Sequence, residues 1–335
     1  MRPRAAVNAP RQRFESVYSS EARARITELV DLDVEAVPLQ PTVEAVIEAC
    51  RGARVIFSTW GAQPYSRDLL DACPDLELIL YAAGSFKAQV TDALLERAPT
   101  VCTAVHVNAV PTAEYSLMLI LAALKDVGPF VHRVRREGPL GFAKDQFGFS
   151  GGYYRTTVAL LGFGLVSRHL AGLLRPFNIH VLMVDDYLGE AEAVQLGVTK
   201  ARLDEAISCA DVVSIHHADV ERNWGIINRR TLALMKPGAR LVNTSRGRMI
   251  DETALVEALE AGRISAYLDV THPEPPREGH PFYTLPNVVL TPHIAGSLGP
   301  EVHQMGDYCV RELEHWLAGE PFEHTVDIAD LADRA

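Results

Sequence analysis

The feature that most constrains this chain is a glycine-rich turn between two apolar, strand-like runs near its middle. The first run, 157–161, leads into the segment GFGLVSR at 162–168, and an apolar helical pattern continues to Leu174. The second run, 180–184, ends at Asp185. A strand, a tight turn, a helix and a strand followed by an acid form the outline of a βαβ unit that binds a dinucleotide. Its central position implies that another domain precedes it.

The positions of this turn have separate physical roles. Gly162 permits a tight turn, and Gly164 allows a pyrophosphate to approach the backbone. Leu165 and Val166 open the following helix, where free N–H groups and the positive end of the helix dipole attract an anion. Asp185 follows about 20 residues later, where an acid accepts hydrogen bonds from the adenosine ribose and repels a 2′-phosphate. The cofactor predicted from these residues is NAD rather than NADP.

One position of the turn departs from the usual pattern, because Ser167 stands where a third glycine is expected. That glycine serves the close packing of helix against strand, and serine is small enough to take its place. An ordinary βα turn that happens to contain two glycines is the alternative interpretation. The strand, the helix and the acid that surround the turn favour the dinucleotide site.

Length and composition limit the class of protein. A chain of 335 residues suggests two domains, and 48% hydrophobic with 22% charged residues is ordinary for a globular protein. The formal net charge of −11 argues against a nucleic-acid-binding surface. The five cysteines are scattered without CxxC spacing, which is typical of a reducing compartment and argues against a structural zinc site. We therefore expect a cytoplasmic protein without a metal.

The sequence predicts neither a membrane span nor a secretory signal. The longest uninterrupted apolar run, 117–124, is too short to cross a bilayer. The N-terminus carries several arginines but no apolar stretch behind them, unlike a signal peptide. Residues 1–13 are predicted to form a frayed basic tail.

Strand-like and helix-like runs alternate along almost the whole chain, which predicts parallel sheets covered by helices on both faces. The expected fold class is α/β, with two doubly wound parallel-sheet domains. The expected strands lie at 55–58, 78–81, 100–102, 157–161, 180–184, 212–215, 240–243, 266–268 and 287–290. The expected helices lie near 21–31, 42–50, 66–72, 91–97 and 252–261, and a last one contains 302–317.

The region between the two domains has its own pattern. Pro111-Thr112 starts a predicted helix, and 115–124 is apolar on every side, as in a helix that is buried all round. Residues 126–156 show weak periodicity, so we expect a loosely structured stretch with a functional or interface role. The expected division is a first domain at 1–124, a dinucleotide-binding domain at 125–294 and a return to the first domain at 295–335.

Three polar side chains, Arg246, Glu274 and His293, follow three strands of the second domain. Ligands of open α/β sheets bind outside the carboxyl ends of the strands, so these side chains could converge on one crevice. A guanidinium holds a carboxylate bidentately, and an imidazole exchanges protons near neutral pH. A neighbouring carboxylate orients the imidazole and favours its protonated form. Each residue alone is more often an ordinary loop residue, but together they favour a site that transfers a hydride and a proton.

These segments resemble the D-isomer-specific 2-hydroxyacid dehydrogenase family. The resemblance covers nearly the whole chain and rests on GFGLVSR, ADVVSIH (210–216), LMKPGARLVNTSRGRMID (234–251), LDVTHPEP (268–275) and TPHIAGS (291–297). It implies a Rossmann NAD-binding domain inserted into a flavodoxin-like substrate domain. It implies Arg246 as carboxylate binder, His293 as acid/base and Glu274 as its partner. It also implies a homodimer with residues 126–156 in the interface.

The resemblance assigns further residues to cofactor and substrate. It places Asp269 near the nicotinamide carboxamide, and its motifs place further cofactor contacts at His216, Thr244, Ser245 and Gly296. The backbone around Ala83, Gly84 and Ser85 is implied to bind the substrate carboxylate, and Asn108 matches the crossover between the domains. Closure of the domains about 108–124 and 294–300 would exclude water from the bound substrate.

Several departures from the family pattern concern the ligand side. His217-Ala218 replaces the usual Leu-Pro, and Tyr115 stands where histidine is common. The substrate loop at 83–88 lacks the usual second glycine and aspartate. We expect Trp60 and Lys87 on the substrate side, where Lys87 could meet a phosphate, a phosphonate or a second carboxylate.

The function expected from the sequence is that of an NAD(H)-dependent 2-hydroxyacid dehydrogenase, which in reverse reduces a small 2-oxo acid. Two alternatives stay open. The same fold can serve as an NAD(H)-sensing binding protein, although retention of the three polar side chains argues against that. A phosphite-type dehydrogenase keeps a similar trio. A formate dehydrogenase is less favoured, because the resemblance would then put an amide where Glu274 stands.

Overall fold

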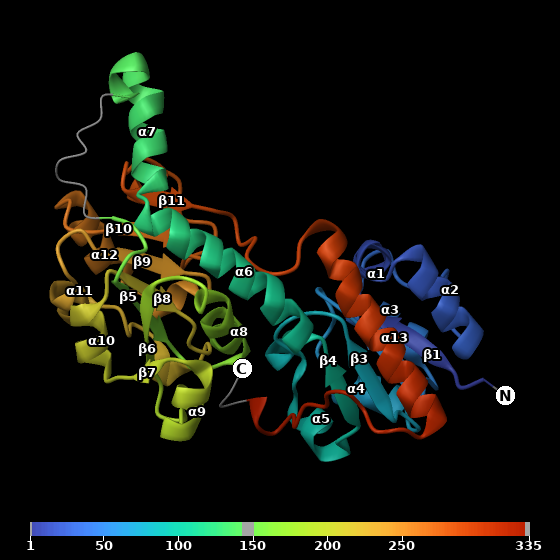
Figure 1. Ribbon diagram of the computed structural model, residues 1–335. Helices are drawn as coiled ribbons and strands as arrows, with labels where there is room; N and C mark the ends of the chain where they lie inside the picture. The colour runs from blue at the N-terminus through green and yellow to red at the C-terminus, as the bar shows by residue number, and fades with distance from the viewer. Residues whose placement is uncertain (1, 143–150, 332–335) are drawn as a thin grey trace. The chain divides into compact units, whose positions relative to one another are not determined.

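A computed structural model of the protein describes residues 2–142 and 151–331, and it divides into two compact units. The first unit comprises Met1–Ala109 and Ser297–Ala335, and the second comprises Val110–Gly296. Each unit contains a parallel sheet with helices on both faces (Figure 1), which confirms the predicted α/β fold class. The units divide at 109/110 and 296/297, whereas the sequence pattern placed the divisions at 124/125 and 294/295.

The sheet of the first unit is doubly wound. Its strands are β1 (Ala5–Asn8), β2 (Val55–Ser58), β3 (Leu78–Tyr81) and β4 (Thr100–Thr103), paired in that order and all parallel. A parallel bridge from Arg4 to Asp31 extends the sheet on the other side of β1. The chain therefore adds strands in both directions from β1, as in flavodoxin-like folds.

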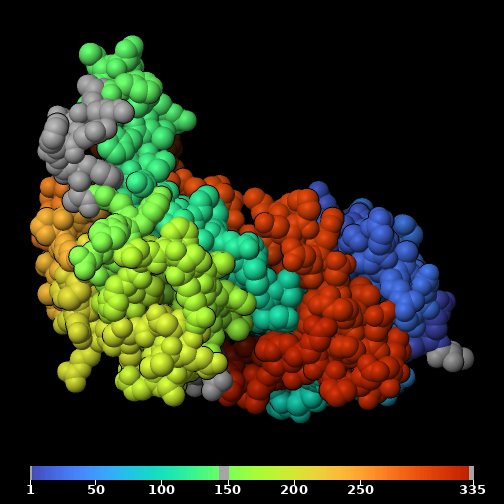
Figure 2. Space-filling model, viewed as in Figure 1, coloured from blue at the N-terminus to red at the C-terminus, as the bar shows by residue number. Residues whose placement is uncertain are grey.

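Helices cover the two faces of this sheet separately. One face packs against α1 (Arg11–Val17), α2 (Ser20–Leu29) and α13 (Val302–Ala318). The other packs against α3 (Val43–Cys50), α4 (Arg67–Ala72) and α5 (Asp92–Arg97). Figure 2 shows the C-terminal residues, in red, spread over this unit beside the N-terminal residues in blue. The segment from Ser297 onward belongs to the same compact unit as the N-terminal segment.

The prediction of a frayed tail at 1–13 is wrong. Residues Ala5–Asn8 form β1, in which all four residues are buried, and α1 begins at Arg11. The run is only four residues long and starts with two alanines, which have weak strand preference, so no local signal marked it. Its stability comes from the pairing with β2, in which Ala5 to Asn8 lie opposite Val55 to Ser58.

The second unit contains a seven-stranded parallel sheet in the order β11-β10-β9-β8-β5-β6-β7. The order reverses between β5 and β8, which is the switch point where ligands of such sheets bind. The strands are β5 (Thr156–Leu161), β6 (Ile179–Val184), β7 (Thr199–Lys200), β8 (Val212–Ile215), β9 (Arg240–Asn243), β10 (Ser265–Leu268) and β11 (Val288–Leu290). The two-residue strand β7 was not predicted, because a pattern of alternation cannot be recognised in so short a run.

Helices cover both faces of this sheet as well. One face packs against α6 (Val105–Leu124), α8 (Leu165–Leu174) and α9 (Glu190–Leu196). The other packs against α10 (Leu203–Cys209), α11 (Arg229–Leu234) and α12 (Glu252–Glu260). Short 3₁₀ turns complete the structure: η1 (Lys87–Gln89), η2 (Gly138–Phe142), η3 (Glu221–Asn223), η4 (Gly247–Met249), η5 (Pro281–Tyr283) and η6 (Gly299–Glu301).

Helix α6 differs from its prediction in two ways. It begins at Val105, so Pro111 lies inside the helix and does not start it. It is also not buried on every side, because Val110 is 39% exposed and Met118 is 49% exposed. In the described part of the chain, α6 is the one helix that is long and apolar enough to cross a membrane. The core helix of a folded domain can have the same length and composition. Its residues Ile120 and Leu124 belong to the core of the second unit.

The stretch 126–156 is more ordered than expected in its first part. Val127–Glu137 forms α7 and Gly138–Phe142 forms η2, while residues 143–150 lie outside the described residues. Helix α7 has no buried residue and projects from the second unit (Figure 1). Its apolar residues Val127, Phe130, Val131 and Val134 recur at i, i+3, i+4 and i+7, a helical periodicity that the sequence analysis missed, although none of them is buried.

A buried ion pair fixes the joint between α6 and α7. Asp126 adopts the left-handed conformation, with φ of 48°, and the chain changes direction there. Its carboxylate receives hydrogen bonds from Arg240 Nε at 3.0 Å and Nη2 at 2.8 Å. The Arg240 side chain is 5% exposed, so its guanidinium group is shielded from water.

We predict that Asp126→Asn destabilises the protein by about 3 kcal/mol, because it leaves the Arg240 guanidinium buried without a counter-ion. Asparagine tolerates the left-handed conformation, so the change isolates the charge. Urea unfolding would measure the effect. Asp204→Asn is the matched control: Asp204 pairs with Arg230 at 2.7 Å on the surface, and its loss should cost less than about 1 kcal/mol. Equal effects of the two variants would contradict the prediction.

Candidate functional site

The glycine turn after β5 has the geometry of a dinucleotide cradle. Gly162 has φ of 105°, and a Cβ atom there would lie 2.6 Å from the backbone nitrogen of His217. Gly164 differs, because no protein atom lies within 4 Å of the position that its Cβ would take. Gly162 is therefore required by the protein itself, whereas Gly164 leaves open space beside the backbone. A pyrophosphate fits that space, at the start of α8.

Ser167 does more than replace a glycine. Its Oγ accepts a hydrogen bond from Gly164 N at 2.9 Å and lies 3.2 Å from Gly164 O, to which it donates. The side chain is fully buried between helix and turn. Because Ser167 satisfies the Gly164 N–H, the N–H groups of Leu165 and Val166 in the first helical turn, which have no intrahelical acceptor, are the ones left for an anion.

Asp185, directly after β6, also holds the glycine turn in place. Its Oδ2 accepts a hydrogen bond from Phe163 N at 2.8 Å, and its Oδ1 accepts one from Tyr187 N at 2.8 Å. Each carboxylate oxygen can accept a second hydrogen bond, so binding of ribose hydroxyls remains compatible with these contacts. The sequence did not reveal the contact with Phe163, which joins the acid predicted to bind the ribose to the turn predicted to bind the pyrophosphate.

Two histidines follow β8 at the switch point. Burial, with a smaller contribution from His217, lowers the pKa of His216 to about 3, so this imidazole is neutral at physiological pH. Its Nε2 lies 2.8 Å from Ser214 Oγ. The pKa of His217 is also lowered by burial, against the pull of Asp185 and Asp186. His217 Nε2 is buried and has no hydrogen-bond partner within the described part of the protein.

The remaining cofactor residues predicted from the motifs lie at the carboxyl end of the same sheet. Thr244 Oγ1 shares a hydrogen bond of 2.8 Å with Ser116 Oγ, and Ser245 Oγ donates to His217 O at 2.6 Å. Both hydroxyls are thus engaged inside the protein. Gly296 is the last residue of the second unit and follows the buried Ala295.

Arg246, Glu274 and His293 follow β9, β10 and β11, which are adjacent and parallel. His293 Nδ1 lies 2.7 Å from Glu274 Oε1. A carboxylate can only accept a hydrogen bond, so Nδ1 carries the proton and Nε2 is the atom that gains or loses one. Both side chains are partly open to solvent, at 44% for His293 and 42% for Glu274. The pairing predicted from the sequence is thus present in the geometry.

Asp269 holds the loop that carries His293. Its Oδ1 accepts hydrogen bonds from Thr291 Oγ1 at 2.7 Å and Ile294 N at 2.9 Å, and its Oδ2 accepts one from Ala295 N at 2.8 Å. Its backbone oxygen accepts from His293 N at 2.9 Å. These bonds hold His293 at φ of 55°, a conformation that a non-glycine residue rarely adopts. The resemblance placed Asp269 near the nicotinamide, and the geometry adds this anchoring role.

A tyrosine extends this anchor to helix α6. Tyr115 Oη donates to Thr291 Oγ1 at 3.0 Å, and Thr291 in turn donates to Asp269. Burial raises the pKa of Tyr115, so the hydroxyl stays protonated and keeps its donor role. The sequence had marked Tyr115 only as a departure from the family pattern.

The loop that carries Arg246 is organised by Asn243, which the sequence analysis did not single out. Asn243 is fully buried at the end of β9. Its Nδ2 donates to Arg246 O at 2.9 Å, and its Oδ1 accepts from Ser245 N at 3.0 Å. Arg246 itself is exposed, and its Nη1 donates to Ser245 O at 2.8 Å. The rest of the guanidinium fork is compatible with a carboxylate ligand.

The substrate residues predicted in the first unit lie on the loop after β3. Ala83 is buried, Ser85 is exposed, and Lys87 begins η1 with its backbone N–H 3.4 Å from Ser85 Oγ. A Cβ at Gly84 would lie 3.3 Å from Asn108 Nδ2. Asn108 also accepts a hydrogen bond from Ser297 N at 2.8 Å, which ties the outgoing and returning chain segments together. Trp60 is partly buried and packs against both cores of this unit.

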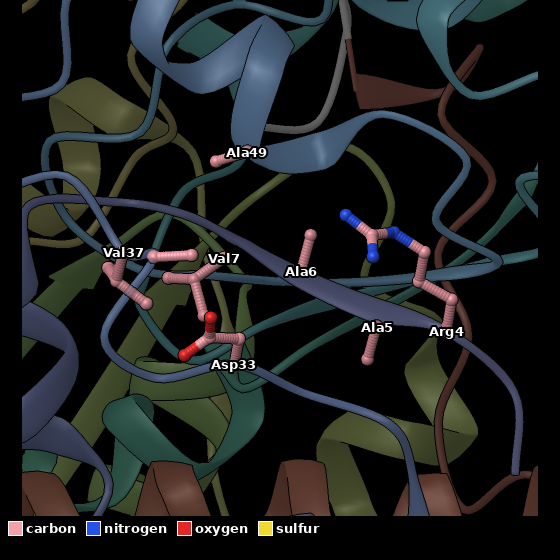
Figure 3. Close-up of a pocket in the computed structure, with 8 residues that line it drawn as sticks. Arg4, Ala5, Ala6, Val7, Asp33, Val37 and Ala49 are labelled. Carbon is pink, nitrogen blue, oxygen red and sulfur yellow. The ribbon is translucent and has the colours of Figure 1, made fainter.

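A small cavity in the first unit is not a substrate site. It lies beside β1 and is lined by Arg4, Val7, Asp33 and Val37 (Figure 3). Its volume of about 30 Å³ is enough for one or two water molecules, far below a ligand pocket. Within the described residues, no group of three or more His, Cys, Asp or Glu side chains could hold a metal ion.

The fold and the glycine turn define a dinucleotide-binding α/β protein, with a hydrogen-bonded His293–Glu274 pair at the sheet edge. The profile of the D-isomer specific 2-hydroxyacid dehydrogenase NAD binding domain matches residues 117–295. A D-3-phosphoglycerate dehydrogenase of Mycobacterium leprae is 30% identical over 263 residues, 78% of this chain and 49% of that protein. The chain therefore belongs to the D-isomer-specific 2-hydroxyacid dehydrogenase family, and its cofactor is NAD.

Other similar proteins match over most of their length. A glyoxylate reductase of Korarchaeum cryptofilum is 29% identical over 300 residues, 89% of this chain and 90% of that protein. The apo structure of D-mandelate dehydrogenase from Rhodotorula graminis has a TM-score of 0.83 at 23% identity, over 97% of this chain and 98% of that one, and shows the fold. By contrast, this chain spans about half the length of the curated phosphoglycerate dehydrogenases that it matches.

The two glycines of the turn should respond differently to alanine. Gly162→Ala should lower the melting temperature, because its Cβ would collide with the His217 backbone. Gly164→Ala should leave the melting temperature unchanged but weaken NADH binding by about tenfold or more, because the methyl group occupies the space meant for the pyrophosphate. Thermal unfolding and titration with NADH would measure both. Normal NADH affinity in a folded Gly164→Ala variant would contradict the assignment of this cradle.

Proposed function

We propose that the protein is an NAD(H)-dependent 2-hydroxyacid dehydrogenase that reduces a small 2-oxo acid, or oxidises the corresponding 2-hydroxy acid. The observation that carries this proposal is the 2.7 Å contact between His293 Nδ1 and Glu274 Oε1, one strand away from the arginine loop. This arrangement can deliver a proton from Nε2 while a guanidinium holds a carboxylate. The names of the matched relatives, a glyoxylate reductase among them, support the same reaction class.

In the proposed reaction, the turn at 162–166 holds the pyrophosphate and Asp185 holds the adenosine ribose. NADH supplies the hydride that reaches the carbonyl carbon of the substrate. Arg246 binds the substrate carboxylate and stabilises the charge that develops on the carbonyl oxygen. His293, protonated on both nitrogens, donates the Nε2 proton to that oxygen, and Glu274 stabilises the imidazolium and fixes its ring. In the oxidative direction, neutral His293 takes the proton back at Nε2.

Residues of the first unit are proposed to complete substrate binding. The backbone of Ala83, Gly84 and Ser85 is assigned to the substrate carboxylate, and Trp60 and Lys87 to the remainder of the molecule. Lys87 is exposed at the start of η1, and its positive charge favours a second anionic group on the substrate. We therefore expect oxo acids with a phosphate, a phosphonate or a second carboxylate to be turned over faster than oxo acids without a second anionic group.

The first experiment is NADH oxidation against glyoxylate, pyruvate, hydroxypyruvate, phenylpyruvate, oxaloacetate and phosphonopyruvate. We expect turnover of at least one. His293→Ala should lower turnover by about 10²- to 10⁴-fold, the usual contribution of a general acid, while NADH still binds. NADH binding without turnover of any oxo acid by the parent protein would favour the NAD(H)-sensing role. Turnover within a few-fold of the parent in His293→Ala would rule out the acid/base assignment.

We also propose a cytoplasmic homodimer formed through residues 126–156. Helix α7 and η2 expose Val127, Phe130, Val131, Leu140 and Phe142, which form an unusual apolar surface for a projecting element. A second copy of the same surface would cover it. Light scattering after size exclusion should give twice the mass of 36.8 kDa, and Phe130→Asp should shift it toward the monomer. A parent protein of monomer mass would contradict this assignment.

A further inference from the structure

Glu274 needs a rigid support, because its own surroundings do not fix it. Its side chain is 42% exposed, yet its carboxylate oxygen lies 2.7 Å from His293 Nδ1. It belongs to a segment, 271–280, that contains no helix or strand. A carboxylate on such a segment keeps a productive position only if the backbone on either side is held. The question is therefore which groups hold that backbone.

The first support is a close backbone approach between the two catalytic segments. Gly247, directly after Arg246, packs so tightly that a Cβ there would lie 2.0 Å from Thr271 C and 2.2 Å from Thr271 O. Thr271 is buried, and its Oγ1 donates to Pro273 O at 2.9 Å. The arginine segment and the Glu274 segment thus meet at Gly247 and Thr271.

The second support is a carboxylate, Glu252, at the first position of α12. Its Oε1 accepts a hydrogen bond from His272 N at 2.7 Å, two residues before Glu274. Burial raises the pKa of Glu252, against the effect of the His272 N–H bond. Its side chain is only 15% exposed, so the carboxylate is largely shielded from water and depends on hydrogen bonds from the protein.

A histidine faces the other oxygen of the same carboxylate. His280 Nε2 lies 3.9 Å from Glu252 Oε2, and its side chain is 22% exposed. His280 Nδ1 accepts a hydrogen bond from Phe282 N at 3.3 Å, so in the neutral ring the proton is on Nε2 and points toward Glu252. Glu252 therefore contacts the segment on both sides of Glu274, at His272 and at His280.

We propose that Glu252 is a positioning residue for the Glu274–His293 pair. It links α12, and through it the loop after Arg246, to the segment that carries Glu274. Arg246, Glu274 and His293 then keep their relative positions as one rigid group, which proton transfer requires. Glu252 touches neither substrate nor cofactor in this role, and it acts through the backbone at His272. The kinetic part of this inference rests on the proposed function.

Three variants test the role. Glu252→Ala should lower kcat by about 100-fold, the effect of a displacement of about 1 Å in a catalytic group. Its dissociation constant for NADH should stay within about twofold of the parent value, because the cradle at 162–166 is untouched. Glu252→Gln should stay within about threefold of the parent in kcat, because the amide oxygen still accepts the His272 N–H bond. Glu257→Ala is the control, since Glu257 lies on the same helix but pairs with Arg229 at the surface.

A pH profile separates positioning from simple loss of stability. In Glu252→Ala, the pH at which kcat/KM is half-maximal should shift, because Glu274 no longer stabilises the imidazolium of His293. A variant that is only less stable would keep the parent profile at temperatures below its unfolding. Glu252→Ala with a parent-like profile and kcat within threefold of the parent overturns the inference. Equal losses in Glu252→Ala and Glu252→Gln also overturn it, because the hydrogen bond would not then be the cause.

An NMR measurement keeps the inference separate from the proposed function. The ring signals of His293, assigned with His293→Gln, can be followed against pH in protein labelled at histidine. The midpoint of their titration should differ between the parent and Glu252→Ala even if no oxo acid is turned over. Identical midpoints would overturn the positioning role. A shifted midpoint in a protein that turns over no oxo acid would support the positioning role of Glu252. The same result would contradict only the proposal that the protein is a 2-hydroxyacid dehydrogenase.

Discussion

Parallel pairing of β9, β10 and β11 is the constraint on which the site depends. In parallel strands all carboxyl ends lie at one edge, so the residues that follow these strands meet there. The loops of Arg246, Glu274 and His293 are far apart in the sequence, and the register of these strands brings them to one place. Because both faces of the sheet are covered by apolar helices, that edge is where polar side chains can gather without being buried unpaired.

Acidic side chains position the loops at this edge by accepting hydrogen bonds from backbone N–H groups. Asp185 holds Phe163, Asp269 holds Ile294 and Ala295, and Glu252 holds His272. Irregular loops leave such donors without partners, and a carboxylate satisfies them more strongly than a neutral group does. The ligand-facing side chains can then stay partly exposed, as His293 and Glu274 are, without losing their geometry.

Much of the fold could be predicted from local sequence because the strands centre on short runs of apolar residues. The strands at 55–58, 78–81 and 212–215, which are mostly apolar, have the predicted bounds, and so does the strand at 240–243, in which Leu241 and Val242 are the apolar residues. Prediction was wrong where local signals were weak or misleading. The run Ala5–Asn8 is stabilised by its neighbour, and Pro111 is tolerated inside α6. Helix Val127–Glu137 was missed for another reason: its apolar spacing does indicate a helix, but that spacing was overlooked within a long irregular stretch. The domain boundary was hidden for a related reason, since α6 runs through it without interruption.

The sequence by itself determined the cofactor class and the identities of the polar trio. Glycines, an acid and strand-ending Arg, Glu and His carry that information locally, through turn conformation, charge and proton affinity. Only the tertiary structure decided which groups support them. The capping of Gly164 by Ser167, the anchoring of the His293 loop by Asp269 and Tyr115, and the hold of Glu252 on His272 join residues that the sequence does not connect. Hydrogen bonds depend on distances of a few tenths of an ångström, and such distances exist only after the sheet and its helices have packed.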